Sequence, residues 1–165
     1  MKKYKYNYVQ SISDTLVEIF IESIKRSTFD RQLEGTILTN VPLAKNRLHE
    51  RGFNQTTEIA KKVAETFNIP FTEDLIKRHD SYGHQALRDK DQRKKIKDGT
   101  FTLREELLPT KCSSITILDD VITTGTTLEE ISSILRKNTN KNIEINALCL
   151  FRGRPYYLET PQILV

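Results

Sequence analysis

Apolar residues recur along the chain at two spacings, one typical of helices and the other of short buried strands. A spacing of three or four residues near the N-terminus predicts an amphipathic helix of about four turns. Its apolar positions are Ile12, Leu16, Val17, Phe20, Ile21 and Ile24. Ser13 or Asp14 is the expected cap of its start. The same spacing from Ile59 to Phe67 predicts a second helix, which Asn68-Ile69-Pro70 ends.

Short runs rich in β-branched residues predict strands that alternate with these helices. The runs cover residues 36–43, 71–78, 115–118 and 143–151, and a third helix is predicted over 128–138. Such alternation is typical of right-handed βαβ units, so the predicted fold class is α/β, a Rossmann-like parallel sheet flanked by helices. Ligands of such sheets bind at the carboxyl ends of the strands.

The most informative stretch is Ile115 to Leu128, which reads ITILDDVITTGTTL. A strand is followed by two carboxylates, Asp119 and Asp120, and then by a loop of small residues that opens a helix. The loop residues are Thr123, Thr124, Gly125, Thr126 and Thr127. Thr127 and Glu130 fit a capping box, which predicts that the helix starts there.

This order of parts suits a ribose phosphate. Backbone N–H groups and hydroxyls at the start of a helix are donors for a phosphate, and Gly125 allows either a close approach or a positive φ. Carboxylates at the end of a strand accept from vicinal hydroxyls or orient water on a divalent cation. The loop is neither a Walker A motif nor a G-x-G-x-x-G fingerprint. The alternative is an ordinary strand-turn-helix with a solvated acidic pair.

Two basic segments could add anion-binding groups. Lys45, Arg47, His49 and Arg51 form a predicted basic turn after Leu43. From Lys77 to Lys97 the chain holds eight Lys and Arg against three Asp. Because residues 80–98 lack apolar periodicity, they are either a solvated linker or a lid that meets a polyanion. The alternative interpretation of the basic turn is a solvated charged turn at the surface.

Length, net charge and cysteine content limit the class of protein. A chain of 165 residues is long enough for one domain, and its net charge of +4 suits anionic ligands without requiring nucleic acid. Cys112 and Cys149 match no zinc spacing, so two reduced thiols are expected. We expect no membrane span and no signal peptide, and therefore a cytoplasmic location.

The stretch from Ile115 to Thr127 resembles the phosphoribosyl-pyrophosphate (PRPP) signature of type I phosphoribosyltransferases. Further residues narrow the resemblance to ComF-type phosphoribosyltransferase-like proteins, over about residues 36 to 154. They are Val41-Pro42-Leu43, the stretch from Arg47 to Gln55, Gln85, Leu87, Arg93, Gly99-Thr100-Phe101 and Phe151-Arg152-Gly153-Arg154. Departures are the missing four-cysteine zinc module of many members, Ile96 where members often have Asn, and Thr123 where hypoxanthine-type relatives have an acid.

The resemblance implies one type I phosphoribosyltransferase domain over 1–165, with a small hood from 1–30 and 152–165 and a lid at 80–98. It implies catalytic and Mg²⁺-linked roles for Asp119 and Asp120, and 5′-phosphate binding by Thr123, Thr124, Gly125, Thr126 and Thr127. Lys45, Arg47 and Arg51 would bind pyrophosphate, Arg51 would also be catalytic, and Gln85 and Arg88 would belong to the lid.

The implied function is Mg²⁺-dependent transfer of phosphoribosyl from PRPP to an unidentified base or amine, with a link to natural transformation. Two alternatives stay open, a non-catalytic PRPP or nucleotide-binding competence factor and a single-stranded-DNA-binding one. The second would use the basic lid and the MKKYKYNY end. Competence-machinery proteins are further candidate partners, and a homodimer is compatible with the sequence.

Overall fold

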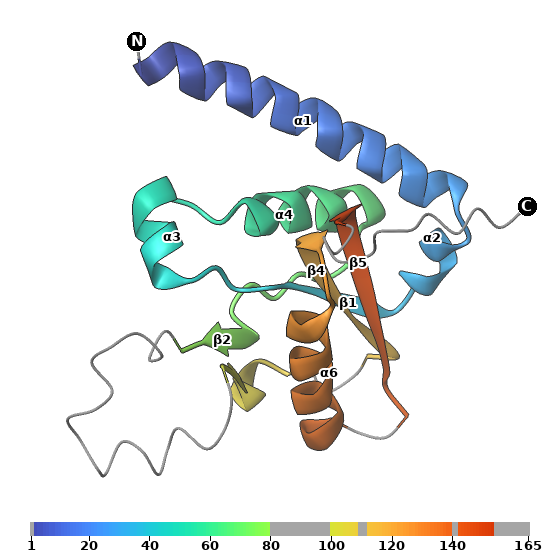
Figure 1. The fold of residues 1–165 in the computed structure, drawn as a ribbon. Coiled ribbons are helices and arrows are strands. Elements are labelled where there is room, and N and C mark those ends of the chain that lie inside the picture. Colours follow the sequence, from blue (N-terminus) through green and yellow to red (C-terminus); the bar gives the residue numbers. More distant parts are fainter. Residues whose placement is uncertain (1, 80–99, 109–111, 140–141, 154–165) are drawn as a thin grey trace, which may run out of the picture.

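The computed structural model describes residues 2–79, 100–108, 112–139 and 142–153 (Figure 1). Its helices are α1 (Lys2–Arg26), α2 (Phe29–Gln32), α3 (Lys45–Arg51), α4 (Gln55–Phe67) and α6 (Thr126–Asn138), with a 3-10 turn at Glu105–Leu107. Its strands are β1 (Thr36–Asn40), β2 (Ile76–Arg78), β3 (Phe101–Leu103), β4 (Ser114–Ile122) and β5 (Glu144–Arg152). Helices and strands alternate as the apolar pattern predicts.

The main sheet is parallel, in the order β1-β4-β5, so β4 is its central strand. A parallel bridge between Leu38 and Phe71 continues the sheet beyond β1. The carboxyl ends of β1, β4 and β5 therefore meet at one edge. β2 and β3 form a separate antiparallel hairpin. The parallel sheet with flanking helices confirms the predicted fold class.

Helices cover both faces of the sheet (Figure 1). On one face, α1 and α4 pack on Leu38, Leu118 and Leu148 through a shared buried cluster. On the other face, α6 packs on Ile115 and Ile117. This two-sided burial explains why β4 reads as a continuous apolar run up to Leu118, because both faces of a central parallel strand lie in the core.

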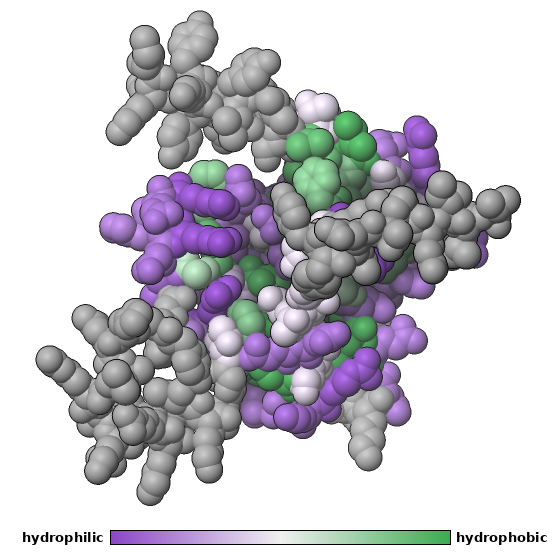
Figure 2. All heavy atoms as spheres, viewed as in Figure 1, coloured by the Kyte–Doolittle hydropathy of each residue, from purple (hydrophilic) through white to green (hydrophobic). Residues whose placement is uncertain are grey.

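The helix α1 is longer than predicted, since it begins at Lys2 and not near Ser13 or Asp14. No Gly or Pro interrupts residues 2–26, so the backbone can continue the helix toward the N-terminus. Figure 2 shows apolar residues gathered along the described half of α1, where the helix lies over the body, and polar residues over α3. Val17, Phe20, Ile21 and Ile24 are buried in the cluster shared with α4 and the sheet, so this apolar side of α1 meets the domain.

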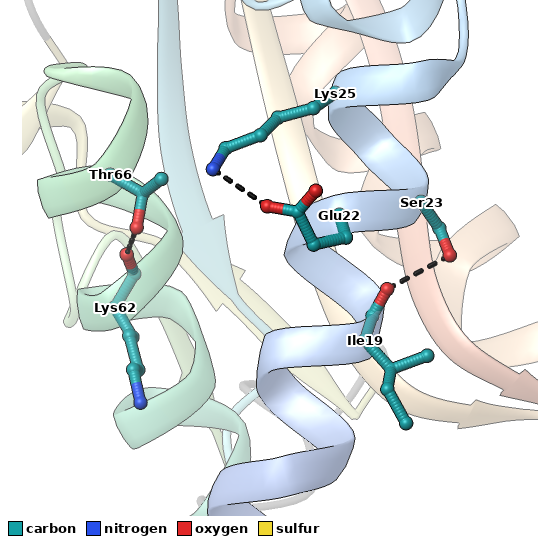
Figure 3. A network of polar contacts seen from close by, with 6 residues as sticks. All are labelled: Ile19, Glu22, Ser23, Lys25, Lys62 and Thr66. Carbon is teal, nitrogen blue, oxygen red and sulfur yellow. Dashed lines mark hydrogen bonds and ion pairs between the residues drawn. The ribbon is translucent and has the colours of Figure 1, made fainter.

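Polar contacts around α1 and α4 are mostly within each helix (Figure 3). Lys25 pairs with Glu22 at 2.9 Å, and the Ser23 hydroxyl donates to the Ile19 carbonyl. Among the side chains that the structure describes, Lys62 Nζ and Glu18 Oε1 form an ion pair of 3.9 Å between the two helices. Exposed pairs of this kind contribute about 0–1 kcal/mol, so apolar burial is what holds α1 on α4.

Several predicted boundaries are wrong. The basic segment after Leu43 is the short helix α3 and not a turn, and Gly52 ends it with a φ of 79°. Residues 71–78 are not one strand, because regular pairing is confined to the Phe71 bridge and β2. The central strand continues to Ile122, so Asp119 and Asp120 lie within it. Parallel pairing with β5 up to Arg152 keeps the backbone of β4 extended past the acidic pair.

Candidate functional site

The loop between β4 and α6 turns at Gly125. Its φ is 86°, in the left-handed region, so the positive-φ role of this glycine is the one observed. A Cβ at this position would meet no atom within 4 Å, which excludes a close approach by protein as its reason. Gly125 is also the N-cap, so the helix starts at Thr126 and the predicted capping box of Thr127 and Glu130 is wrong.

The predicted phosphate-binding residues line one small hollow at the N-terminus of α6. Its volume is about 40 Å³, and its walls are Asp119, Val121, Ile122, Thr123, Thr124, Gly125, Thr126, Thr127 and Leu128. The hydroxyls of Thr124 and Thr126 lie 3.0 Å apart and share a hydrogen bond. A helix N-terminus presents unpaired N–H groups and a positive dipole end, so this hollow suits a small anion.

Asp119 adds a half-buried carboxyl to the wall of the same hollow. Burial first, and then the negative charge of Asp120, raise its pKa from 3.8 to about 6. Its Oδ1 accepts a hydrogen bond of 2.9 Å from the backbone N–H of Asp120. Cys149 lies opposite it on β5, and burial and the Asp119 charge raise the pKa of that thiol. The site thus disfavours the ionised form of Asp119. A bound cation or hydroxyl donors would favour that ionised form.

The two acidic residues are not equivalent in the structure. Asp119 lines the hollow, whereas Asp120 is not among its walls. Side chains of successive strand residues point to opposite faces, which explains the difference. Asp120 acts on the hollow through its charge, as the raised pKa of Asp119 indicates.

The end of β5 packs closely against the loop. The N–H of Gly153 donates to the carbonyl of Ile122 at 2.8 Å. A Cβ at Gly153 would lie 3.2 Å from Cγ2 of Thr123, which is tighter than ordinary van der Waals contact. Gly153 therefore lets β5 approach the first loop residue. The sequence pattern singled out Gly153 by resemblance alone and gave no sign of this contact.

The residues predicted to bind pyrophosphate lie on α3 and not on the loop between β4 and α6. Lys45, Arg47 and Arg51 are exposed, and Lys45 lines a different hollow of about 440 Å³ with Leu48, His49 and Gly52. Arg51 donates to Oε1 of Gln55 at 3.1 Å. In Figure 1, α3 stands apart from the N-terminus of α6. The structure brings Asp119 together with the threonine loop but leaves the three cations outside that hollow.

Buried amides fix the chain between β1 and α4. Asn40 is 2% exposed, and its Nδ2 donates to Oγ1 of Thr57 and to the carbonyl of Val41. Asn54 caps α4 by accepting from Thr56 N–H, and its Nδ2 also donates to the Val41 carbonyl. These amides tie both ends of the α3 segment to the sheet. Their side chains were not singled out for this role from the sequence.

The whole predicted lid at 80–98, with its site positions Gln85 and Arg88, lies outside the described residues, and so does Arg154 of the stretch that carries the family resemblance. Within the described part of the chain, no cluster of three or more His, Cys, Asp or Glu side chains could hold a metal ion. In the same residues, no helix is long and apolar enough to cross a membrane.

No protein-family model matches the chain, but curated proteins do. Competence protein F of Haemophilus influenzae is 29% identical over 147 residues, which are 88% of this chain and 64% of that protein. The DNA utilization protein YhgH of Shigella flexneri is 26% identical over 88% of this chain and 63% of its own length. The chain thus spans somewhat less than two thirds of these relatives.

Solved structures share the fold at low sequence identity. Glutamine PRPP amidotransferase from B. subtilis matches with a TM-score of 0.52 and 17% identity, over 82% of this chain and 25% of that one. The allosteric regulatory enzyme of purine biosynthesis matches with a TM-score of 0.53 and 16% identity, over 82% of this chain and 26% of that one. The chain is thus similar in sequence to competence protein F and to YhgH, and its fold is that of type I phosphoribosyltransferases.

Proposed function

We propose that the hollow between β4 and α6 binds the 5′-phosphate of PRPP, with the ribose hydroxyls directed to Asp119. The observation that supports this proposal is that Asp119 and the five residues from Thr123 to Thr127 line one hollow at a helix N-terminus. A phosphate there would accept from backbone N–H groups and threonine hydroxyls, and such charge-assisted bonds contribute about 1.5–3 kcal/mol each. Donation by ribose hydroxyls would favour the ionised form of Asp119.

The acidic pair also fits Mg²⁺. Asp119 and Asp120 repel each other, since the charge of Asp120 raises the pKa of Asp119, and a cation would relieve this repulsion. Mg²⁺ is commonly bound by one or two carboxylates together with substrate oxygens and water, and so needs no third protein ligand. When bound, it would neutralise charge on the departing pyrophosphate.

The proposed reaction is transfer of phosphoribosyl to a nitrogen acceptor. The bond from the anomeric carbon to pyrophosphate breaks, a bond from that carbon to nitrogen forms, and the nitrogen loses a proton. The chain supplies position, because the phosphate loop and Asp119 would hold the ribose at two points. Lys45, Arg47 and Arg51 would approach the pyrophosphate from α3, with Gln85 and Arg88 from the lid excluding water.

A second candidate is a PRPP or nucleotide-binding competence factor without catalysis, including one that binds single-stranded DNA. The names of the relatives, competence protein F and DNA utilization protein, favour a link with DNA uptake. Binding groups and catalytic groups coincide in this site, so PRPP binding is common to the enzyme and the PRPP-binding factor. Release of pyrophosphate in the presence of candidate acceptors separates the two.

The first test is calorimetric titration of the protein with PRPP and Mg²⁺, with ribose 5-phosphate and AMP as comparison ligands. We expect saturable PRPP binding that weakens without Mg²⁺. Asp119→Asn combined with Asp120→Asn should weaken PRPP binding at least tenfold and leave the protein folded, because Asp119 lines the hollow, Asp120 acts on it through its charge, and neither side chain is fully buried.

The matched control is Glu129→Gln, which removes an exposed carboxylate from the first turn of α6 without touching the hollow. We expect its PRPP affinity to stay within about twofold of the wild type. Absence of PRPP binding by the folded wild type would refute the proposal, and so would unchanged affinity in the double variant. Salt-sensitive DNA binding that survives the double change would favour the DNA-binding factor.

A further inference from the structure

Glu130 reaches from α6 to the hairpin of β2 and β3. Its Oε1 accepts two backbone hydrogen bonds, from the N–H of Thr100 at 2.6 Å and from the N–H of Phe101 at 3.3 Å. The side chain is half-buried. A carboxylate that accepts from two backbone donors is a strong and directional link, because charge-assisted hydrogen bonds are about twice as strong as neutral ones.

Apolar contacts surround this link. Phe101 is 3% exposed and lies in the same buried cluster as Leu128 and Ile131, which come just before and just after Glu130 on α6. The carboxylate therefore sits beside a packed interface between α6 and β3. Losing the acceptor would leave two partly buried N–H groups without it, which favours a shift of one element against the other.

The hairpin itself is held at the same place. His79 N–H donates to the carbonyl of Thr100 at 2.9 Å, and His79 Nε2 lies 2.8 Å from Oγ1 of Thr102. Arg78 and Phe101 are register partners in the antiparallel pair. Thr100 is thus fixed by its carbonyl to His79, which follows β2, and by its N–H to Glu130 of α6, so the hairpin and the helix are joined through one residue.

The helix that receives this link carries the proposed phosphate site. Gly125 opens α6, and its carbonyl accepts from the N–H of Glu129 in the first turn. Glu130 follows in the same turn region, so a tilt of α6 at Glu130 would also redirect the N–H groups of Thr126 and Thr127. The unpaired N–H groups are effective only when they converge on one anion.

We propose that Glu130 is a positioning residue, which fixes the phosphate loop by anchoring α6 to the backbone of Thr100 and Phe101. It joins two stretches that are far apart in the sequence, Thr100-Phe101 and the loop from Thr123 to Thr127. The inference rests on the proposed function, because the loop it positions is the proposed phosphate site. Glu130 does not line the hollow and acts through the helix.

The test compares ribose 5-phosphate and PRPP affinities of Glu130→Ala, Glu130→Gln and the control Glu129→Ala, by calorimetry well below each melting temperature. We expect Glu130→Ala to bind both ligands about tenfold more weakly. Glu130→Gln keeps an oxygen acceptor and should stay within about threefold of the wild type, and Glu129→Ala within about twofold. A residue that only stabilised the fold would lower the melting temperature and leave the affinity of the folded protein unchanged.

Amide hydrogen exchange of Thr100 and Phe101 separates the possible failures. Faster exchange at these two amides in Glu130→Ala is expected, and unchanged exchange would overturn the link itself. Unchanged affinity in folded Glu130→Ala, with the wild type binding normally, would overturn the positioning role alone. Absence of binding by the wild type would overturn both proposals. If Glu130→Ala does not fold, Glu130→Asp, whose carboxylate is one methylene shorter, replaces it with the same expected weakening.

Discussion

Asp119 is the residue whose surroundings bear most directly on the site. It lies in the extended backbone of β4, next to Asp120 and opposite Cys149, and burial is the larger cause of its raised pKa. The folded-state pKa of about 6 exceeds the ordinary value of 3.8, so the folded protein disfavours the ionised carboxyl. A group of this kind contributes stability below pH 3.8, and that stability is lost as the pH rises through 6.

Asp119→Asn should therefore stabilise the protein at pH 8 and change little at pH 3.5. At pH 8 the expected gain in free energy of unfolding is about 1 kcal/mol, once solvent screening of the half-buried group is discounted. Urea unfolding of wild type and variant at the two pH values measures it. A stability difference that is the same at both pH values would contradict the raised pKa.

At the scale of elements, the loop takes its shape from two neighbours. The helix α6 supplies the N-cap at Gly125, and β5 supports the other side of the loop through Gly153. Gly153 sits where a side chain would press on the methyl group of Thr123. The approach of β5 therefore limits where the first loop residue can lie.

Gly153→Ala should displace Thr123 and weaken ribose 5-phosphate binding about three- to tenfold, because the added Cβ would lie 3.2 Å from Cγ2 of Thr123. Calorimetric titration measures the affinity. Thr123→Ser removes that methyl group and keeps the hydroxyl, so the double variant should recover most of the lost affinity. Equal weakening in the single and double variants would show that this contact is not the cause.

At the scale of the whole molecule, two buried clusters hold helices on opposite faces of one sheet. The carboxyl edge is left for the loop, for α3 and for the ends of β1 and β5. Isoleucines of α1 illustrate the division between core and surface, since Ile24 is 3% exposed and Ile19 is 59% exposed. Substitutions at these two positions measure how much α1 contributes to stability.

Ile24→Ala should destabilise the protein by about 2–5 kcal/mol, because it removes buried methyl and methylene groups and leaves a cavity. Ile19→Ala makes the same chemical change on the same helix at an exposed position, and should cost less than about 1 kcal/mol. Denaturant unfolding of both variants gives the comparison. Similar costs at the two positions would contradict the packing of α1 on the sheet.

The sequence by itself determined the order of the elements and the place of the site. Apolar spacing located α4 and α6, and β-branched runs located the three strands of the parallel sheet. Chain order then placed Asp119 and the threonine loop at the carboxyl edge, because strands that alternate with helices run parallel. These features depend on local composition and periodicity, which a single sequence displays directly.

Tertiary structure decided where the strands and helices begin and end and which groups are hydrogen-bond partners. Pairing with β5 extends β4 beyond Asp120. The carboxylate of Glu130 accepts hydrogen bonds from the backbone of Thr100 and Phe101, and not from the start of its own helix as in a capping box. The pKa of Asp119 and the contact of Gly153 likewise depend on groups brought from other strands. None of these follows from local spacing, because hydrogen-bond partners and desolvation are set by which elements pack together.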